Sequence, residues 1–197
     1  MMTAAFPNPR QPDHPVDALF IDRWSPRAFA LDTMQPEDVL TILEAARWAP
    51  SSSNRQPWRF VWALRGEAGF AAIAAALVPG NRVWAEKAAA LVVVASKTTV
   101  TRDGVAVANG AHAFDAGTAW GHLALQTHLK GYSAHAMGGF DAAALTAAVA
   151  LPENHALHAV VALGRRGNPA SLSEDQRGRE MPNGRLPLAE VARHGSF

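Results

Sequence analysis

Two arginines flank a serine in a short, proline-interrupted stretch near the amino-terminal end of the sequence. The stretch runs from Arg23 to Arg27 and reads R-W-S-P-R. A guanidinium group donates two parallel, charge-assisted hydrogen bonds to a phosphate, and the hydroxyl of Ser25 adds a neutral donor. These residue types indicate a candidate anion site, although two solvated surface arginines would give the same pattern.

A second polar segment, residues 50–57, contains three serines and two amide side chains. Asn54 and Gln56 are two residues apart, so on an extended backbone their side chains project to the same side. Amide groups both donate and accept hydrogen bonds, which suits the edge of a flavin ring with its N3–H donor and its carbonyl and N5 acceptors. A loop that only caps a helix and turns the chain is the alternative interpretation.

Two adjacent glycines, Gly138 and Gly139, follow a predicted strand and precede Asp141, a candidate helix N-cap. Without side chains, their backbone N–H groups can be approached closely by a planar ligand. The pair also suits a tight strand-to-helix turn, and both interpretations can hold together.

Arginines outnumber acidic residues between positions 165 and 185. They are Arg165, Arg166, Arg177, Arg179 and Arg185, against Glu174, Asp175 and Glu180. This tail could deliver a further cation to a phosphate, whereas a surface loop held by ion pairs is the alternative.

Several common catalytic motifs are missing from the sequence. It contains no G-x-G-x-x-G, G-x-x-x-x-G-K-[ST], H-E-x-x-H or G-x-S-x-G pattern. His112 with Asp115 and His155 with His158 have suggestive spacings, but a metal site needs three or four convergent ligands. We therefore expect surface or capping histidines and no metal.

Composition narrows the class of protein. The 197 residues carry 18 basic against 17 acidic side chains, and 49% are apolar while only 18% are charged. We expect an N-terminal arm over residues 1–15 and one domain over 16–197, with surplus apolar surface at an oligomer interface. A net charge of +1 argues against nucleic acid as a partner. The longest apolar run, 88–95, is too short to span a membrane, so we expect a cytoplasmic protein.

The absence of cysteine excludes disulfides, iron–sulfur clusters and thiol catalysis. Any redox chemistry then needs a bound cofactor.

Hydrophobic periodicity and the positions of proline and glycine predict helices alternating with strands. The expected helices are 16–22, 36–48, 66–77, 111–130, 141–152 and 188–193. The expected strands are 58–64, 91–96, 132–136 and 157–163, with 91–96 buried on both faces. Residues 97–109 and 165–185 are expected to be loops. This alternation indicates a layered α+β or α/β fold.

Four segments, in this order, resemble the FMN-dependent nitroreductase family over about residues 16–192. They are R-W-S-P-R-A-F, E-A-A-R-W-A-P-S-S-S-N-R-Q-P-W-R-F, M-G-G-F-D and G-R-L-P-L-A-E-V. The resemblance implies an α+β fold of three layers, with a central, mainly antiparallel sheet flanked by helices. It also implies a homodimer of mutually embracing subunits, with FMN bound at the interface.

The resemblance assigns residues to each part of the cofactor. For the phosphate, ribityl and pyrimidine end of FMN these are Arg23, Trp24, Ser25 and Arg27, with Arg185 as a late phosphate ligand. For the flavin-contacting loop, partly reaching from the second subunit, they are Pro50, Ser51, Ser52, Asn54 and Gln56. For the wall near flavin N5 they are Ala136, Met137, Gly138 and Gly139.

One position departs from the family pattern. Many relatives carry a second cation two residues before the late arginine, where this chain has Asn183. Phosphate affinity would then depend on Arg23, on Arg185, or on Arg165 and Arg166 as substitutes.

The implied activity is hydride transfer from NADH or NADPH to flavin N5, and then to a nitroaromatic, a quinone or a similar small acceptor by a ping-pong mechanism. Trp84, Phe70 and residues 97–109 are candidates for shaping the acceptor pocket. Two alternatives remain open: a specialised flavin reaction such as dehalogenation, azoline oxidation or flavin breakdown, and FMN binding without turnover.

Overall fold

A computed structural model describes residues 8–196, so residues 1–7 of the expected arm and residue 197 lie outside the described part of the chain. The helices are α1 (Ala18–Asp22), α2 (Pro36–Arg47), α3 (Ala68–Ala75), α4 (Pro79–Ala85), α5 (His112–Leu129), α6 (Ala142–Ala148), α7 (Glu174–Gly178) and α8 (Leu188–Val191). The strands are β1 (Trp58–Leu64), β2 (Ala90–Lys97), β3 (Thr99–Arg102), β4 (Val105–Ala108), β5 (Ser133–Met137) and β6 (His155–Gly164). Two short 3-10 helices, η1 (Ser52–Asn54) and η2 (Pro169–Ser171), complete the elements.

The main sheet has the order β1-β2-β6-β5, and every neighbouring pair is antiparallel. The two central strands are apolar on both faces because side chains alternate along a strand. Leu91, Val93 and Val160 belong to one core cluster, while Val92, Val94 and Val161 belong to the other. The prediction of a strand buried on both faces is therefore confirmed for β2.

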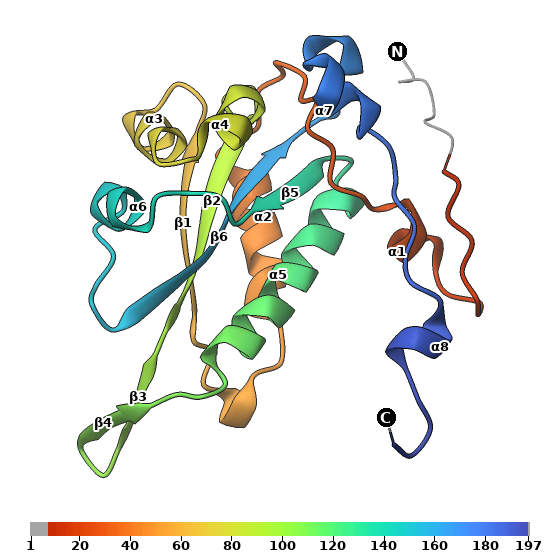
Figure 1. The fold of residues 1–197 in the computed structure, drawn as a ribbon. Coiled ribbons are helices and arrows are strands. Elements are labelled where there is room, and N and C mark those ends of the chain that lie inside the picture. Colours follow the sequence, from red (N-terminus) through yellow and green to blue (C-terminus); the bar gives the residue numbers. More distant parts are fainter. Residues whose placement is uncertain (1–7, 197) are drawn as a thin grey trace.

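Helices cover both faces of this sheet (Figure 1). On one face α2 and α5 contribute Val39, Ile42 and Leu123 to the core. On the other face α3, α4 and α6 contribute Ile73, Trp84 and Leu145. The result is the expected three-layer α+β architecture.

Residues 97–109 form a hairpin, so their prediction as a loop was wrong. Strands β3 and β4 pair antiparallel around Asp103 and Gly104, whose φ angles are 49° and 79°. A two-residue turn with both φ angles positive matches the right-handed twist of the flanking strands, and Asp-Gly is a favoured sequence for it. That dipeptide, with the short alternation around it, was the available signal.

Three further short elements were not anticipated. Helix α4 begins at Pro79, a residue whose fixed φ suits the first helical turn. The tail expected to be a loop contains η2 and α7, and the side chain of Ser173 caps α7 by accepting a hydrogen bond from the backbone N–H of Gln176. Pro169 similarly begins η2.

A close backbone contact fixes the chain immediately after the R-W-S-P-R segment. Phe29 and Arg166 form an isolated antiparallel bridge, and the N–H of Gly167 donates to the carbonyl of Ala28 at 2.7 Å. A Cβ atom on Gly167 would lie only 2.5 Å from the backbone of Phe29. Glycine at this position therefore allows the two segments to approach.

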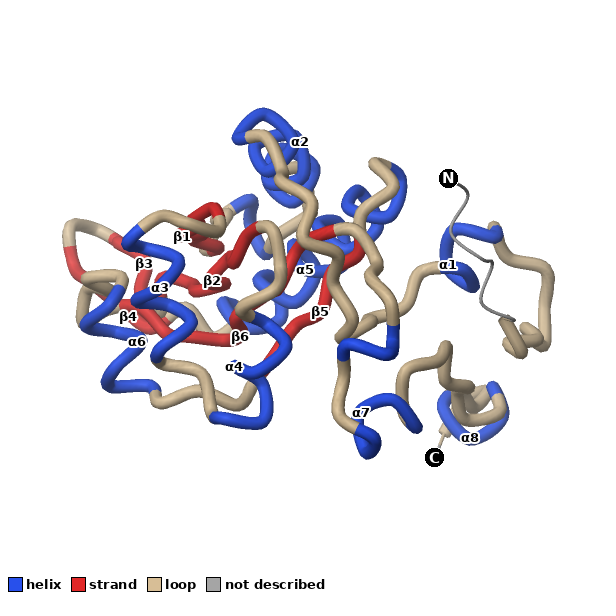
Figure 2. Tube along the Cα trace, turned by 90° about the horizontal axis from the view of Figure 1, so that it is seen from above, coloured by secondary structure: helices blue, strands red, loops and turns tan. Residues whose placement is uncertain are grey.

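The two terminal regions lie together at one side of the molecule, beyond the end of the sheet. Figure 2 shows α1 and α8 at the same end of the molecule, where residues of both line one cavity, and α1 also contacts α5. Segments from opposite ends of the chain thus meet beside one end of the long helix.

We predict that Gly167→Ala lowers the free energy of unfolding by about 2 kcal/mol or more, because the added methyl group overlaps the backbone of Phe29. For a chain of this size the melting temperature should fall by about 5 °C or more in a thermal melt. Gly178→Ala is the control, since a Cβ atom there meets no other atom within 4 Å. Equal melting temperatures for the two variants would contradict the close-approach explanation.

Candidate functional site

A cavity of about 530 Å³ lies between α1, α5 and β5. Its polar lining comes from Arg23, Ser25 and His135. Its apolar lining comes from Phe20, Trp120, Gly121, Ala124, Leu125 and Ala136. Of the predicted site residues, the structure thus brings Arg23, Ser25 and Ala136 to one cavity, with a wall that small residues of α5 leave open to a flat ligand.

A buried carboxylate holds in place the backbone segment that follows Arg23. Glu180 is 5% exposed, and its side chain accepts hydrogen bonds from the backbone N–H groups of Arg27 and Ala28 at 2.8–3.0 Å. Because these N–H groups occupy the carboxylate, Glu180 orients the segment without forming an ion pair with Arg27. Sequence analysis had placed Glu180 only among the acids that offset the arginine-rich tail.

His135 is a further lining residue that sequence analysis missed. Its Nδ1–H donates to the carbonyl of Pro26 at 3.0 Å, and its ring lies 4.6 Å from the ring of Trp84. Burial, together with the charges of Arg27 and Arg23, lowers the pKa of His135 to about 4, despite the raising effect of its backbone hydrogen bonds. The imidazole is therefore neutral at pH 7 and acts as a fixed hydrogen-bond donor to the segment.

Arg23, which lines this cavity, lies close enough to Arg185 for their charges to interact, and Arg185 lines an adjoining cavity of about 760 Å³ that shares Phe20 with the first. Arg23 is half-buried, and burial together with the charge of Arg185 lowers its pKa. Arg23 donates through Nη1 to the Ser25 hydroxyl at 3.4 Å, and Arg185 donates to the carbonyls of Asn183 and Gly184. Within residues 8–196, neither arginine lies within 4.0 Å of a carboxylate as an ion pair. Their charge is therefore available to an anion.

The predicted flavin-contacting loop lies away from this cavity. The N–H of Ser52 donates to the carboxylate of Asp115 in the first turn of α5, at 3.2 and 3.3 Å. The cavity instead contacts the middle of that helix, from Trp120 to Leu125. Pro50, Ser51, Ser52, Asn54 and Gln56 are therefore not brought to Arg23 within one chain.

The extended backbone expected around Asn54 and Gln56 was wrong. The φ angles of these residues are 52° and 48°, in the left-handed region, and Ser53 has a φ of 51°. The Gln56 amide donates to the carbonyl of Asn54 at 3.0 Å, and the Ser51 hydroxyl accepts from the N–H of Gln56. Local side-chain hydrogen bonds hold this tight turn, as they commonly do for serine and asparagine.

The residues of the Ala136–Gly139 segment have different surroundings. Ala136 lines the cavity, whereas the side chain of Met137 is buried in the core. A Cβ atom on Gly139 would lie 2.8 Å from Nδ2 of Asn81, whose amide donates to the Gly139 carbonyl. Gly138 is exposed, with nothing within 4 Å of a Cβ atom. Packing thus explains Gly139, while Gly138 leaves room for a ligand.

The remaining predicted residues have identifiable positions. Trp24 is 8% exposed and Arg27 is half-buried. Arg165, one suggested substitute cation, places its guanidinium 4.7 Å from the ring of Tyr132 and donates to the carbonyl of Gly131. Arg166 makes the backbone bridge to Phe29.

No three histidine, aspartate or glutamate side chains within residues 8–196 come together in a way that could hold a metal ion. No helix in the same range is long and apolar enough to cross a membrane.

Comparison with known proteins identifies the relatives of this architecture. A model of the nitroreductase family matches residues 21–165, which is most of the chain. The chain belongs to the nitroreductase family. A crystal structure of an oxidoreductase containing FMN superposes with a TM-score of 0.94 at 44% identity, over 100% of this chain and 98% of the other.

Two further proteins are also similar to this chain, one at lower sequence identity and one over a shorter stretch of sequence. A Desulfovibrio desulfuricans protein named as a nitroreductase, solved in complex with FMN, has a TM-score of 0.72 and 27% identity over 94% of this chain and 99% of its own. Nitrobenzene nitroreductase of Ectopseudomonas oleovorans is 47% identical over 53 residues, 27% of this chain and 23% of that enzyme. The match to this enzyme therefore spans less than a quarter of its length.

We predict that the flavin-free protein loses stability as the pH falls from about 6.5 to about 4, in part through His135. Between these values the unfolded chain binds a proton at this histidine and the folded chain does not, so stability rises with pH across the window. The contribution is about 3 kcal/mol at most. Urea unfolding of wild type and His135→Gln between pH 4 and 7 measures it, with exposed His194→Gln as control. Identical pH dependence in wild type and His135→Gln would contradict the burial of a neutral imidazole.

Proposed function

We propose that this protein is an FMN-dependent oxidoreductase that transfers hydride from NADH or NADPH to a nitroaromatic, a quinone or a similar small acceptor. The observation that carries the proposal is a pair of guanidinium groups without carboxylate ion pairs in residues 8–196: Arg23 in a cavity lined mainly by apolar residues, and Arg185 in the cavity that adjoins it. FMN has the matching shape and chemistry, with a phosphate dianion at one end and a flat ring system at the other. The FMN-containing relatives support the same choice of cofactor.

The residues present fit the two ends of FMN. Arg23 and Arg185 repel each other and lack an ion pair in the described chain, so a dianion between them would relieve an unfavourable interaction. The Ser25 hydroxyl adds a neutral donor beside Arg23. Small and aromatic residues of α5 leave a flat apolar surface on which a ring could lie.

The chain would bind and orient the cofactor, whose own chemistry carries the electrons. When bound, FMN would accept hydride at N5 and pass it to a second substrate, which replaces the oxidised nicotinamide. Arg27 places a positive charge near His135, a lining residue of the cavity, and a positive charge near a bound flavin would favour electron transfer into its ring. His135 stays neutral and holds Pro26, so it positions this segment rather than exchanging protons.

A homodimer would complete the site. The loop 50–56 lies at the first turn of α5, away from the cavity of its own chain, so it is free to reach the cavity of a second copy. Large apolar side chains on α1 and α5 also face solvent in the single chain, with Phe20 58% and Phe114 80% exposed. A second subunit would cover this surface, since patches of this kind mark interfaces.

The first prediction from this proposal concerns the phosphate site. Purified wild-type protein should be yellow and should oxidise NADH or NADPH in the presence of a nitroaromatic or a quinone. Arg23→Ala should weaken FMN binding by about 10-fold or more, because a charge-assisted hydrogen bond is lost. The variant should also melt at a lower temperature in the presence of FMN, since bound ligand stabilises the native state.

Fluorescence titration and an assay of NAD(P)H oxidation check these outcomes. Arg47→Ala is the control, because Arg47 is exposed and pairs with Glu44 on α2. Full FMN occupancy in Arg23→Ala would refute the phosphate role. Bound FMN that neither nicotinamide reduces would instead indicate an FMN-binding protein without turnover.

The second prediction concerns the loop. Asn54→Ala and Asn54→Gly should both leave FMN bound but change its rate of reduction, because both remove the amide. Only alanine strains the backbone, since Asn54 has a positive φ that glycine adopts freely. Stopped-flow reduction by NADH or NADPH measures the rate, with Ser53→Gly as the loop control. Unchanged rates in both Asn54 variants would mean that Asn54 is only a turn residue.

A further inference from the structure

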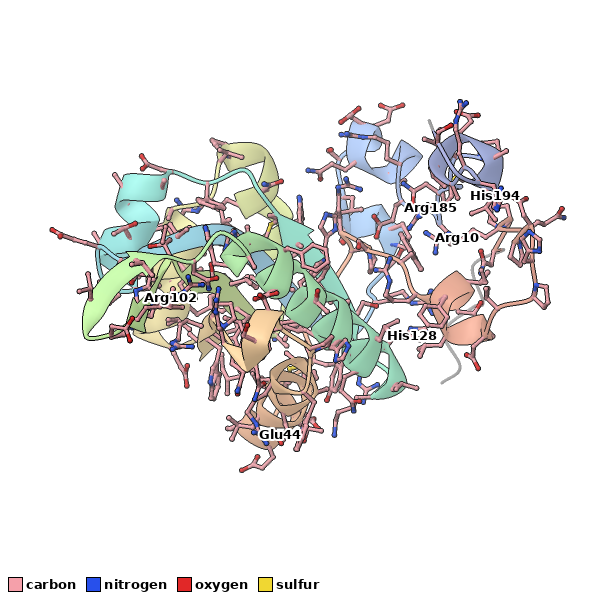
Figure 3. The ribbon with its side chains drawn as sticks, turned by 90° about the horizontal axis from the view of Figure 1, so that it is seen from below. Arg10, Glu44, Arg102, His128, Arg185 and His194 are labelled. Atoms are coloured by element: carbon pink, nitrogen blue, oxygen red, sulfur yellow. The ribbon has the colours of Figure 1, made fainter. Side chains whose placement is uncertain are left out.

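Arg10 is a third cation in this region, and together with Arg185 it lines the adjoining cavity of about 760 Å³ between α1 and α8. Neither the sequence motifs nor the comparisons assign it a role. Its Nη1 donates to the carbonyls of Ile21 at 2.9 Å and Arg23 at 2.7 Å. Its Nε donates to the carbonyl of Asn183 at 2.7 Å, and its Nη2 donates to the Asn183 side-chain oxygen at 3.2 Å. Figure 3 shows Arg10 beside Arg185, between α1 and the carboxyl-terminal elements.

These four hydrogen bonds hold the guanidinium of Arg10 but leave its charge unneutralised. All four acceptors are neutral oxygens, and within residues 8–196 no carboxylate forms an ion pair with Arg10. Arginine has five N–H groups, so one on Nη2 still has no hydrogen-bond acceptor in the described chain. Neutral hydrogen-bond acceptors thus hold the side chain of Arg10 in one position, and one N–H group on Nη2 remains available as a donor.

The charge of Arg10 acts on the same site as Arg23 and Arg185. Burial lowers the pKa of Arg10, and the charges of Arg185 and Arg23 lower it further, whereas Asp22 raises it. Asp22 also accepts a hydrogen bond from the amide of Asn8, so it only partly offsets three guanidinium groups. Three like charges held this close favour a ligand with more than one negative charge.

Asn183 provides the neutral anchor that this arrangement needs. Its carbonyl and its amide oxygen both accept from Arg10, so Asn183 aligns the fork of the guanidinium from two directions. A lysine at position 183 would repel Arg10 and would bring its own positive charge to the same place. Arg165, by comparison, lies over Tyr132 and lines neither of the two cavities.

We propose that Arg10, aligned by Asn183, is a phosphate-binding residue of the cofactor site and supplies its third positive charge. The proposal rests on the proposed function, because it takes the FMN phosphate as the anion. A purely structural alternative is that Arg10 only ties the amino-terminal segment to the carboxyl-terminal tail. The two roles predict different effects on flavin affinity. If Arg10 binds the phosphate, its loss weakens the binding of FMN but not of riboflavin. If Arg10 is only a structural tie, its loss affects both flavins alike.

The test is the affinity of FMN and of riboflavin, which lacks the phosphate, for flavin-free protein. Flavin fluorescence titration of wild type, Arg10→Ala and Arg10→Ala/Asn183→Lys gives both dissociation constants for each protein. We expect Arg10→Ala to weaken FMN binding by about 10-fold and riboflavin binding by less than about 2-fold. The added lysine should restore most of the FMN affinity.

Arg82→Ala is the matched control, because Arg82 is an exposed arginine paired with Glu86 on α4. Its affinities for both flavins should equal those of wild type. If circular dichroism shows that Arg10→Ala does not fold, Arg10→Gln replaces it in the titration. Glutamine keeps hydrogen-bonding capacity without charge, so this variant should show the same loss of FMN affinity with little loss of riboflavin affinity.

Equal weakening of FMN and riboflavin in Arg10→Ala would overturn the proposal in favour of the structural tie. Unchanged FMN affinity would overturn it as well. If wild-type protein binds neither flavin, the proposed function itself fails. That outcome is distinct, because it appears before any variant is made.

Discussion

The repulsion among guanidinium groups is the constraint around which the terminal regions of this protein are arranged. Arg10, Arg23 and the exposed Arg185 are held within range of one another's charge, and the partial burial of Arg10 and Arg23 makes this repulsion stronger than it would be in bulk solvent. Asp22 offsets this cost only in part. The buried carboxylate of Glu180 instead accepts from backbone N–H groups, so it fixes the segment and leaves the positive charge to a ligand.

The fold supplies the contacts that overcome this repulsion. Segments far apart in sequence meet here, because Arg10 binds Asn183 and the bridge between Phe29 and Arg166 ties the early segment to the end of β6. Gly167 permits that bridge, because a side chain at this position would overlap the backbone of Phe29. The three-layer core therefore does more than bury apolar surface, since it places two chain ends beside α5.

The sequence predicted those parts of the fold that depend on local chemistry. Strand β1 has the predicted bounds, and α2 begins at the proline expected in its first turn. The 97–109 hairpin also depends on local chemistry, because its Asp-Gly turn indicates a two-residue hairpin connection in the sequence itself. Helix α4 is short, so its periodicity was too weak to read.

The site was only partly predictable, for a physical reason. Arg23 and Ser25 lie close in sequence, and their types already indicated an anion site. The anchors of that site are long-range: Glu180 binds backbone 152 and 153 residues away, and Asn183 binds a side chain 173 residues away. His135 could not be distinguished from other histidines, because its low pKa arises from burial that only the tertiary structure creates.

The central claim is that these arginines receive the phosphate of FMN while α5 supports the ring. Electron density for the FMN-loaded protein tests it most directly. We expect the phosphate within hydrogen-bond distance of Arg23 and Arg185, about 2.7–3.2 Å, with the ring near Trp120. We also expect the loop 50–56 at the ring to belong to a second subunit. A phosphate bound away from this cluster, or a ring enclosed by one chain alone, would contradict it.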